Sequence, residues 1–262
     1  MDTKDRLLVV PHAGLHFLPL HLAGPPGSPL ADQWTVTYLL NLAQLTSRRT
    51  AVQAPALRRD AAVFALGYQD QPRLPALNCS VAEAQAIANI VGVTPMLDPA
   101  ATESAFAHAL QTCRFVHLRA HGKHNVDAPL FQTVFLAPGA GHDGRLRAHE
   151  VLPLDLHGLE LVTLGACETA LGRTDISDNL RGMPAALLLA GAQAVVGTMW
   201  PVDAEASTTF FTELYRSLTV DAADLIEAFA VAQHATRALH PEYRDWGAFN
   251  LTGGLPTRRD RT

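Results

Sequence analysis

The strongest constraint on the fold is an alternation between short apolar runs and amphipathic segments, which fills most of the chain after residue 60. Apolar runs of strand length occur at 61–67, 114–122, 160–166 and 193–200. Segments with apolar residues at helical spacing separate these runs. Strands that alternate with helices predict an α/β domain with a largely parallel sheet.

Capping residues mark the expected helices. Ser80 and Glu83 form a capping-box pair at the start of a helix over 80–92, which Gly92 ends. Further helices are expected over 101–113, with Thr102 as N-cap, over 176–192, and over 203–218 and 221–239, each of the last two beginning at an Asp N-cap. A last strand is expected over 246–253.

Residues 1–58 have a different pattern, in which strand-like segments are separated by the Pro/Gly-rich stretch "GPPGSPLADQ". They predict an N-terminal strand extension that either continues the main sheet or pairs beside it. We therefore expect this extension over 1–58, a main domain over 59–254, and a solvated tail over 255–262.

Charge and composition exclude several classes of protein. The chain has 20 Lys and Arg against 25 Asp and Glu, a net charge of −5, and no basic tract, which argues against nucleic-acid binding. The N-terminus does not resemble a signal peptide. The apolar window at 182–200 is interrupted by Gly191 and Gln193, so we expect no membrane span. The three cysteines have no CxxC spacing, which favours a reducing, cytoplasmic location.

Two of the expected strands end in residues that could act together. One run delivers His121 followed by Gly122, and another delivers Cys167. Neighbouring parallel strands release their C-terminal residues into the same crevice, so the imidazole and the thiol can form a dyad. The imidazole would draw the thiol toward thiolate, the actual nucleophile. On these residues alone, a buried and inert cysteine remains the commoner reading.

A family resemblance changes that balance, because blocks over roughly 7–253 resemble the CHAT domain, a caspase-like peptidase domain found with TPR repeats. The family belongs with caspases, separases and gingipains. The matching blocks are "LLVVPHAGLHFLPLHLA" (7–23), "LPALNCSVAEAQAI" (74–87), "FVHLRAHG" (115–122), "LVTLGACETALG" (161–172), "GMPAALLLAGAQAVVGTMWPVDAEAS" (182–207) and "WGAFNLTG" (246–253).

The resemblance implies a caspase-like, three-layer α/β/α fold and a cysteine endopeptidase that needs no metal or organic cofactor. It implies that His121 is the general base and acid, that Cys167 is the nucleophile, and that the backbone N–H groups of Gly122 and Cys167 hold the oxyanion. It also implies a protein substrate, a TPR-type or other sensor as activator, and a bacterial, intracellular role in defence or programmed death.

Two positions depart from the family pattern. Gly165 stands where the family often has Ser, and Arg119 stands where a small or apolar residue is usual. We expect the first to loosen the turn that presents the thiol and the second to alter the charge of the cleft.

The specificity pocket is open to two interpretations. Asp203 either provides a pocket carboxylate for a basic P1 side chain, as an acidic residue does in the related separases, or caps the helix that starts at Ala204. Glu168 either contacts substrate or bonds a loop.

Other functions remain as alternatives. The chain could be a catalytically silent interaction module or a different Cys-dependent acyl hydrolase on the same sheet. His117, His121 and His124 suggest a metal site, but no Cys or carboxylate at ligand spacing completes a tetrahedral set. No phosphate-binding Gly motif is present, so nucleotide chemistry has no support.

Overall fold

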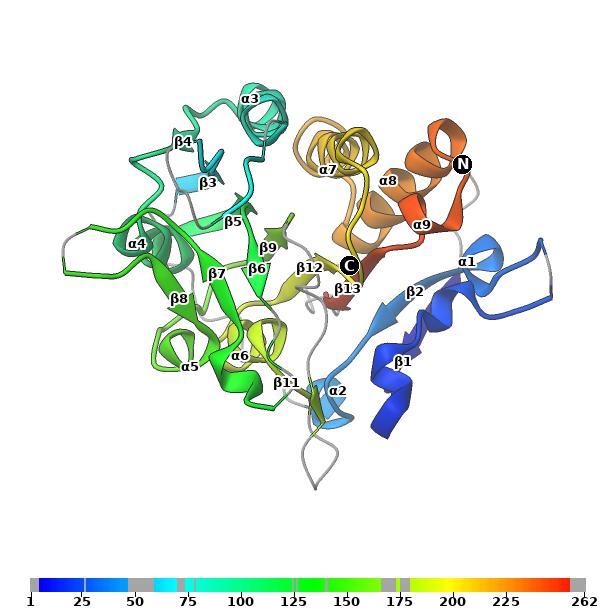
Figure 1. The fold of residues 1–262 in the computed structure, drawn as a ribbon. Helices are drawn as coiled ribbons and strands as arrows, with labels where there is room; N and C mark the ends of the chain where they lie inside the picture. The colour runs from blue at the N-terminus through cyan, green and yellow to red at the C-terminus, as the bar shows by residue number, and fades with distance from the viewer. Residues whose placement is uncertain are drawn as a thin grey trace.

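The chain folds around one eight-stranded sheet with helices on both faces (Figure 1). The structure is a computed structural model that describes residues 5–25, 27–46, 59–69, 74–77, 79–123, 125, 127–139, 141–165, 173–174 and 180–254. Across the sheet the strands follow the order β1 (Asp5–Val9), β2 (Trp34–Tyr38), β13 (Phe249–Gly253), β12 (Ala194–Thr198), β9 (Leu161–Leu164), β5 (Cys113–Arg119), β3 (Arg59–Ala65) and β4 (Met96–Leu97).

Strand directions divide the sheet into two parallel blocks. Strands β4, β3, β5, β9 and β12 run parallel to one another, and β13, β2 and β1 form a second parallel group. The two groups meet where β12 pairs antiparallel with β13. The predicted α/β fold with a mostly parallel sheet is thus confirmed.

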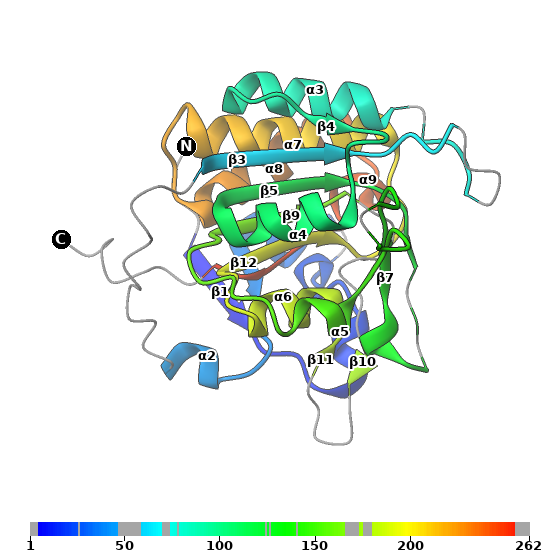
Figure 2. The same cartoon turned by 90° about the vertical axis from the view of Figure 1, so that its left-hand side faces the viewer.

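Helices form a layer on each face of the sheet, as Figure 2 shows from the side. One layer contains α4 (Glu103–Thr112), α5 (Ala148–Val151) and α6 (Met183–Leu189), and the other contains α3 (Ser80–Val91), α7 (Ala204–Thr219) and α8 (Leu225–Leu239). Strand β3 shows why both layers are needed: Ala62 and Phe64 pack with the first, whereas Ala61, Val63 and Ala65 pack with the second. A strand that buries both faces needs apolar residues at nearly every position.

Helix α3 begins at Ser80 as expected, but its expected capping box is wrong, and so is the expected start of α8. Helix α3 has Cys79 as its N-cap with no side-chain cap, because Ser80 Oγ donates to Leu77 O and Glu83 is buried inside the molecule. Helix α8 begins after Asp224, whose side chain accepts from Glu227 N, and not after Asp221. The N-cap predicted at Thr102 is confirmed by its bond from Ala105 N.

Helix α6 begins at Met183, later than the expected start at residue 176, because strand β11 (Leu180–Arg181) directly precedes it; residues 175–179 lie outside the described part of the chain. The smaller elements form two further sheets and several short helices. They are β6 (Gly122–Lys123), β7 (Thr133–Phe135) and β8 (Arg145–Arg147); β10 (Arg173–Thr174) and β11 (Leu180–Arg181); α1 (Leu30–Gln33), α2 (Ala43–Thr46) and α9 (Tyr243–Trp246); and η1 (Ala13–Phe17), η2 (Leu20–Leu22) and η3 (Pro129–Phe131). Within the described ranges, no helix has the length and apolarity to cross a membrane.

The N-terminal strands continue the main sheet, since β2 pairs with β13 and β1 with β2. His21 ties this part to the rest of the molecule. Its Nε2 donates to Gly247 O at 2.8 Å, and its Nδ1 lies 2.8 Å from Tyr38 Oη. The expected boundary at residue 58 and the expected tail over 255–262 lie outside the described residues.

Candidate functional site

The site lies where parallel strands end together. Strands β3, β5, β9 and β12 run the same way, and Figure 2 shows the arrows of β3 and β5 ending on one side of the molecule. A small pocket lies at this edge, as expected for an open α/β sheet. It is lined by Leu77, Arg119, Ala120, His121, Gly165, Thr198 and Val202.

His121 follows β5 and is held by a backbone carbonyl. Its Nε2 lies 2.7 Å from Pro75 O. A carbonyl oxygen only accepts, so Nε2 carries a proton and Nδ1 is the ring nitrogen left for other chemistry. A base whose second nitrogen is oriented by a third group is the arrangement that nucleophilic catalysis needs.

Tyr68 fixes His121 from the other side. The two rings lie 4.7 Å apart between centroids, and Tyr68 Oη accepts from His121 N at 2.8 Å and donates to Phe135 O at 2.5 Å. Phe135 N in turn donates to His121 O. The Tyr68 hydroxyl therefore links His121 N to Phe135 O, in place of a direct hydrogen bond between these two backbone groups. Burial raises the pKa of Tyr68, which keeps the phenol protonated as a donor.

Tyr68 has a backbone conformation unusual for an aromatic residue, with φ at 57°. The Asp98 carboxylate stabilises it by accepting from Gly67 N at 2.7 Å and from Tyr68 N at 3.2 Å. Sequence reasoning missed Tyr68. The available signal was its place just after a strand that neighbours the His121 strand.

A buried polar cluster lies beneath the pocket, on the α3 and α7 side of the sheet. Glu83 of α3 is 1% exposed and accepts from Ser207 Oγ at 2.8 Å. Its Oε1 lies 3.3 Å from His117 Nε2 and 3.9 Å from Arg119 Nε. Burial acts to raise the pKa of Glu83, but His117, Arg119 and Ser207 together hold it below its ordinary value. Glu83 is therefore a buried carboxylate.

His117 extends this cluster into the core. Its Nδ1 lies 2.9 Å from Thr163 Oγ1, which lies 2.7 Å from Tyr215 Oη. The rings of Phe211 and Tyr215 enclose the imidazole edge to face. His117 thus faces the helices α3 and α7, while His121 lies at the pocket. The two are not parts of one ligand set.

Gly165 makes the room that Arg119 occupies. A Cβ on Gly165 would lie 3.1 Å from Arg119 Cδ, 3.2 Å from Glu83 Oε1 and 3.3 Å from Phe211 Cε2. Arg119 Nη1 donates to Gly165 O at 2.8 Å, and Gly165 N donates to Leu118 O. The two departures from the family pattern are thus one physical feature. Both bonds hold the backbone at Gly165, and the rest of the turn that leads to the thiol lies outside the described residues, so the expected loosening stays a prediction.

The other expected site residues have different positions. Asp203 caps α7, accepting from Glu205 N at 2.9 Å and from Ala206 N at 3.4 Å. Gly122 begins β6, opposite Val134 of β7. Cys167 and Glu168 lie outside the described residues, as does His124. In the part of the chain that the structure describes, no three His, Cys, Asp or Glu side chains gather as a metal-ligand set.

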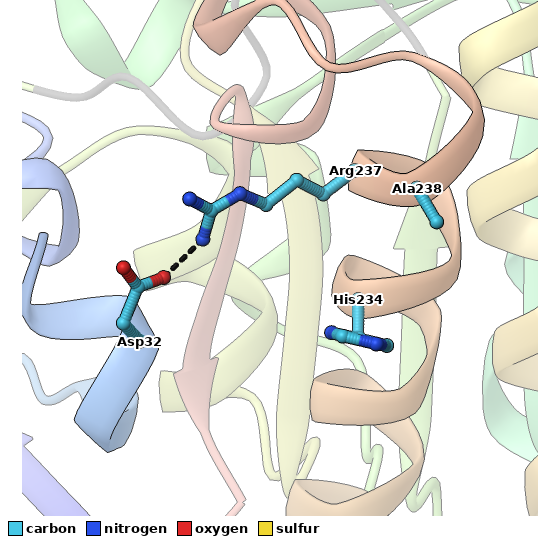
Figure 3. Close-up of a pocket in the computed structure, with 4 residues that line it drawn as sticks. All are labelled: Asp32, His234, Arg237 and Ala238. Carbon is cyan, nitrogen blue, oxygen red and sulfur yellow. Dashed lines mark hydrogen bonds and ion pairs between the residues drawn. The ribbon is translucent and has the colours of Figure 1, made fainter. Parts of the chain in front are cut away.

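A second pocket lies between α1 and α8 and is drawn in Figure 3. Asp32 of α1 pairs with Arg237 of α8, and His234 lies one turn away on the same helix. The Arg237 guanidinium also stacks over the Trp246 ring at 4.6 Å. These contacts hold the N-terminal extension against α8 and involve no strand end.

Comparisons with known sequences agree with this architecture. The model of the family described as CHAT domain matches residues 1–254. Tetratricopeptide repeat protein 28 from Homo sapiens is 31% identical over 169 residues, which cover 62% of this chain and 6% of that protein. The Mus musculus protein of the same name is 37% identical over 111 residues, 41% of this chain and 4% of that protein. The chain therefore spans only a small part of the length of these relatives.

Solved structures show the same fold. The Arg specific cysteine proteinase gingipain R superposes with a TM-score of 0.61 at 12% identity, covering 97% of this chain and 63% of that one. The Saccharomyces cerevisiae separase–securin complex gives a TM-score of 0.62 at 16% identity, covering 91% of this chain and 14% of that one. The predicted caspase-like fold is thereby confirmed.

Proposed function

Because the chain belongs to the CHAT domain family, we propose that it is a cysteine endopeptidase in which His121 and Cys167 are the catalytic residues. One observation carries this proposal. His121 is oriented at the end of β5 by Pro75 O and by the Tyr68 ring, with Nδ1 as the ring nitrogen that remains. A catalytic dyad needs an imidazole that is oriented at the edge of the sheet with one ring nitrogen available. A histidine with a purely structural role would not need this arrangement.

The strand register supports the choice of Cys167 as the partner. In the paired strands, Leu118 of β5 lies opposite Leu164 of β9, and Arg119 Nη1 bonds the carbonyl of Gly165, a residue 46 positions later in the chain. The same offset of 46 positions separates His121 from Cys167. In the sequence, two residues, Gly165 and Ala166, separate the last residue of β9, Leu164, from Cys167.

The proposed mechanism follows from these groups. His121 Nδ1 takes the proton of the Cys167 thiol, and the thiolate attacks the scissile carbonyl. The C–N bond then breaks while the imidazolium protonates the leaving amine. Water, deprotonated by His121, hydrolyses the acyl-enzyme and releases the second product. The bond from Nε2 to Pro75 O stabilises the imidazolium in this cycle.

An oxyanion hole from the N–H groups of Gly122 and Cys167 completes the proposal. In an antiparallel ladder, the N–H groups of successive residues point alternately toward and away from the partner strand. Phe135 N donates to His121 O, so His121 faces β7 and the next residue, Gly122, directs its N–H away from it. This supports a Gly122 N–H that is not used in the β6–β7 pairing, next to the pocket residue His121, and such catalysis requires a donor of this kind.

Further contacts and partners belong to the same proposal. Asp203 and Glu168 are proposed substrate contacts, and capping of α7 leaves the exposed Asp203 carboxylate able to accept another bond. The tetratricopeptide repeat proteins that resemble the chain support a TPR-type partner as activator. A latent peptidase that a sensor switches on, acting in the cytoplasm in defence or programmed death, fits these features. The predicted bacterial origin remains a prediction.

The test is cleavage of a fluorogenic peptide panel by the wild-type protein and by Cys167→Ala and His121→Ala. We expect cleavage by wild type only, with each variant reduced by at least about 100-fold. Equal residual cleavage by wild type and Cys167→Ala, both with and without a candidate TPR-type partner, would exclude peptidase activity.

Latency is tested separately, by labelling Cys167 with a peptidyl electrophile with and without a candidate TPR-type partner. Labelling that needs the partner indicates a latent peptidase. Absence of labelling under both conditions would favour the catalytically silent interaction module. Labelling with cleavage of esters but not of peptides would favour an acyl hydrolase.

A further inference from the structure

The pocket beside His121 has an unusual charge. Of its seven described lining residues, Arg119 alone carries a formal positive charge, and none of them is a carboxylate. Asp203 is not among them. The pocket has a volume of about 20 Å³, so it admits only the end of a side chain. A group that enters it would meet a cation and an imidazole between apolar walls, which Leu77 and Val202 contribute.

The Arg119 guanidinium is held in one orientation. Nη1 donates to Gly165 O at 2.8 Å and to Ser207 Oγ at 3.1 Å. The missing side chain of Gly165 lets the Arg119 stem lie against the strand end. A guanidinium fixed in this way loses little further rotamer freedom when a ligand binds, which favours affinity.

Part of this guanidinium remains available. No described residue forms a hydrogen bond with Nη2, and the side chain is 13% exposed. Glu83 lies behind it, with Oε1 at 3.9 Å from Nε, and is buried beneath the pocket without lining it. Glu83 thus keeps the cation in place but does not occupy the position that an entering carboxylate would take. Planar N–H groups of arginine bind carboxylates strongly and selectively.

We propose that Arg119 determines specificity at this pocket and that the pocket receives an acidic P1 side chain, Asp or Glu. The inference rests on the proposed peptidase function, and it selects an acidic over a basic P1 residue because Arg119 lines the pocket and Asp203 does not. Gly165 contributes by giving Arg119 its space.

The first arm of the test measures cleavage of peptides that differ only at P1, with Asp, Glu, Asn, Leu and Arg. We expect wild type to cleave the Asp or Glu peptide at least about 10-fold faster than the Asn peptide, and the Arg peptide most slowly. In Arg119→Gln, the ratio of the cleavage rate of the acidic peptide to that of the Asn peptide should fall toward one. Arg119→Lys should keep part of this preference because the positive charge remains.

A matched variant guards against loss of folding. Arg119→Gln leaves the Glu83 charge buried without its cation, so the double variant Glu83→Gln with Arg119→Gln removes both charges together. It should lose the acidic preference as Arg119→Gln does. An unchanged ranking of P1 residues in either folded variant overturns the assignment of Arg119.

The second arm uses the Cys167→Ala protein, which binds the same peptides without cleaving them. Fluorescence anisotropy should show tighter binding of the Asp or Glu peptide than of the Asn peptide, and the difference should disappear with Arg119→Gln. Absence of that difference in the Cys167→Ala protein overturns the pocket assignment.

The two arms separate this inference from the peptidase proposal. If the acidic peptide binds in an Arg119-dependent way and wild type cleaves none of the panel even with the TPR-type partner present, the pocket assignment stands and the peptidase proposal fails. If wild type cleaves the Arg or Leu peptide best, peptidase activity stands and the pocket assignment falls.

Discussion

Two buried histidines, His21 near the N-terminus and His117 on β5, lie in polar clusters of opposite character. The His21 cluster is closed: its ring nitrogens meet Tyr38 Oη and Gly247 O, and its own N–H donates to Tyr38 Oη at 3.0 Å. Burial lowers the pKa of His21 to about 4, so the ring is neutral near pH 7. This cluster joins the N-terminal extension to the end of α9 and contains no charged group.

The His117 cluster is open. Within the described part of the chain, Glu83 Oε1, His117 Nε2 and Arg119 Nε are buried without a hydrogen-bond partner. Glu83 Oε1 nevertheless lies 3.3 Å from His117 Nε2 and 3.9 Å from Arg119 Nε. Buried polar atoms are nearly always paired, with protein groups or with ordered water, so these three atoms make the His117 cluster less completely hydrogen-bonded by protein groups than the His21 cluster. The open cluster adjoins a pocket, whereas the closed one fastens two segments.

The largest expected effect breaks the open cluster. Glu83→Leu removes the carboxylate that balances Arg119, and we expect the free energy of unfolding to fall by about 3–5 kcal/mol, as for other broken buried pairs. Urea unfolding followed by circular dichroism measures it. Asp32→Asn is the matched control, because its pair with Arg237 is partly exposed and should change stability by at most about 1 kcal/mol. Equal losses in both variants would contradict the distinction.

The closed cluster should respond to pH. Because burial lowers the pKa of His21 from 6.5 to about 4, its contribution is fully present above pH 6.5 and is lost as the pH falls toward 4. We expect this residue to account for about 3 kcal/mol of the fall in unfolding free energy over that range. His21→Gln should flatten the fall relative to wild type. The same slope in both proteins would contradict the neutral, buried state of His21.

A smaller effect tests the fit between Gly165 and Arg119. Gly165→Ser places a Cβ 3.1 Å from Arg119 Cδ, so we expect a loss of about 1–3 kcal/mol of unfolding free energy from overpacking. The double variant with Arg119→Ala should lose less than the sum of the two single variants, with a coupling of about 1 kcal/mol. Additive losses would show that the two residues do not share this space.

Local patterns predicted most of the architecture. The apolar run at 61–67 became β3, Thr102 caps α4, and Asp203 caps α7 as one of its two interpretations required. These features depend on neighbouring residues, which a sequence displays directly. The parallel register then brings the His121 strand and the strand before Cys167 side by side.

Features that depend on distant contacts were not predicted. Glu83 has the spacing of a capping box, yet its carboxylate meets Ser207, which is 124 positions away in the chain. Tyr68 and Pro75 approach His121 from segments that the sequence leaves unconnected with it. At the start of α8, Asp221 and Asp224 both suit an N-cap, and the apolar stripe that begins at Leu225 decides for Asp224.

The most direct test of the central claim is the rate at which iodoacetamide alkylates each cysteine at pH 6, measured by peptide mass spectrometry. Cys79 is exposed and Cys113 is buried, so both serve as internal references. If His121 activates Cys167, this thiol should react at least about 10-fold faster than Cys79, and His121→Ala should remove the advantage. Reaction of Cys167 at the rate of Cys79, unchanged in His121→Ala, would contradict the dyad.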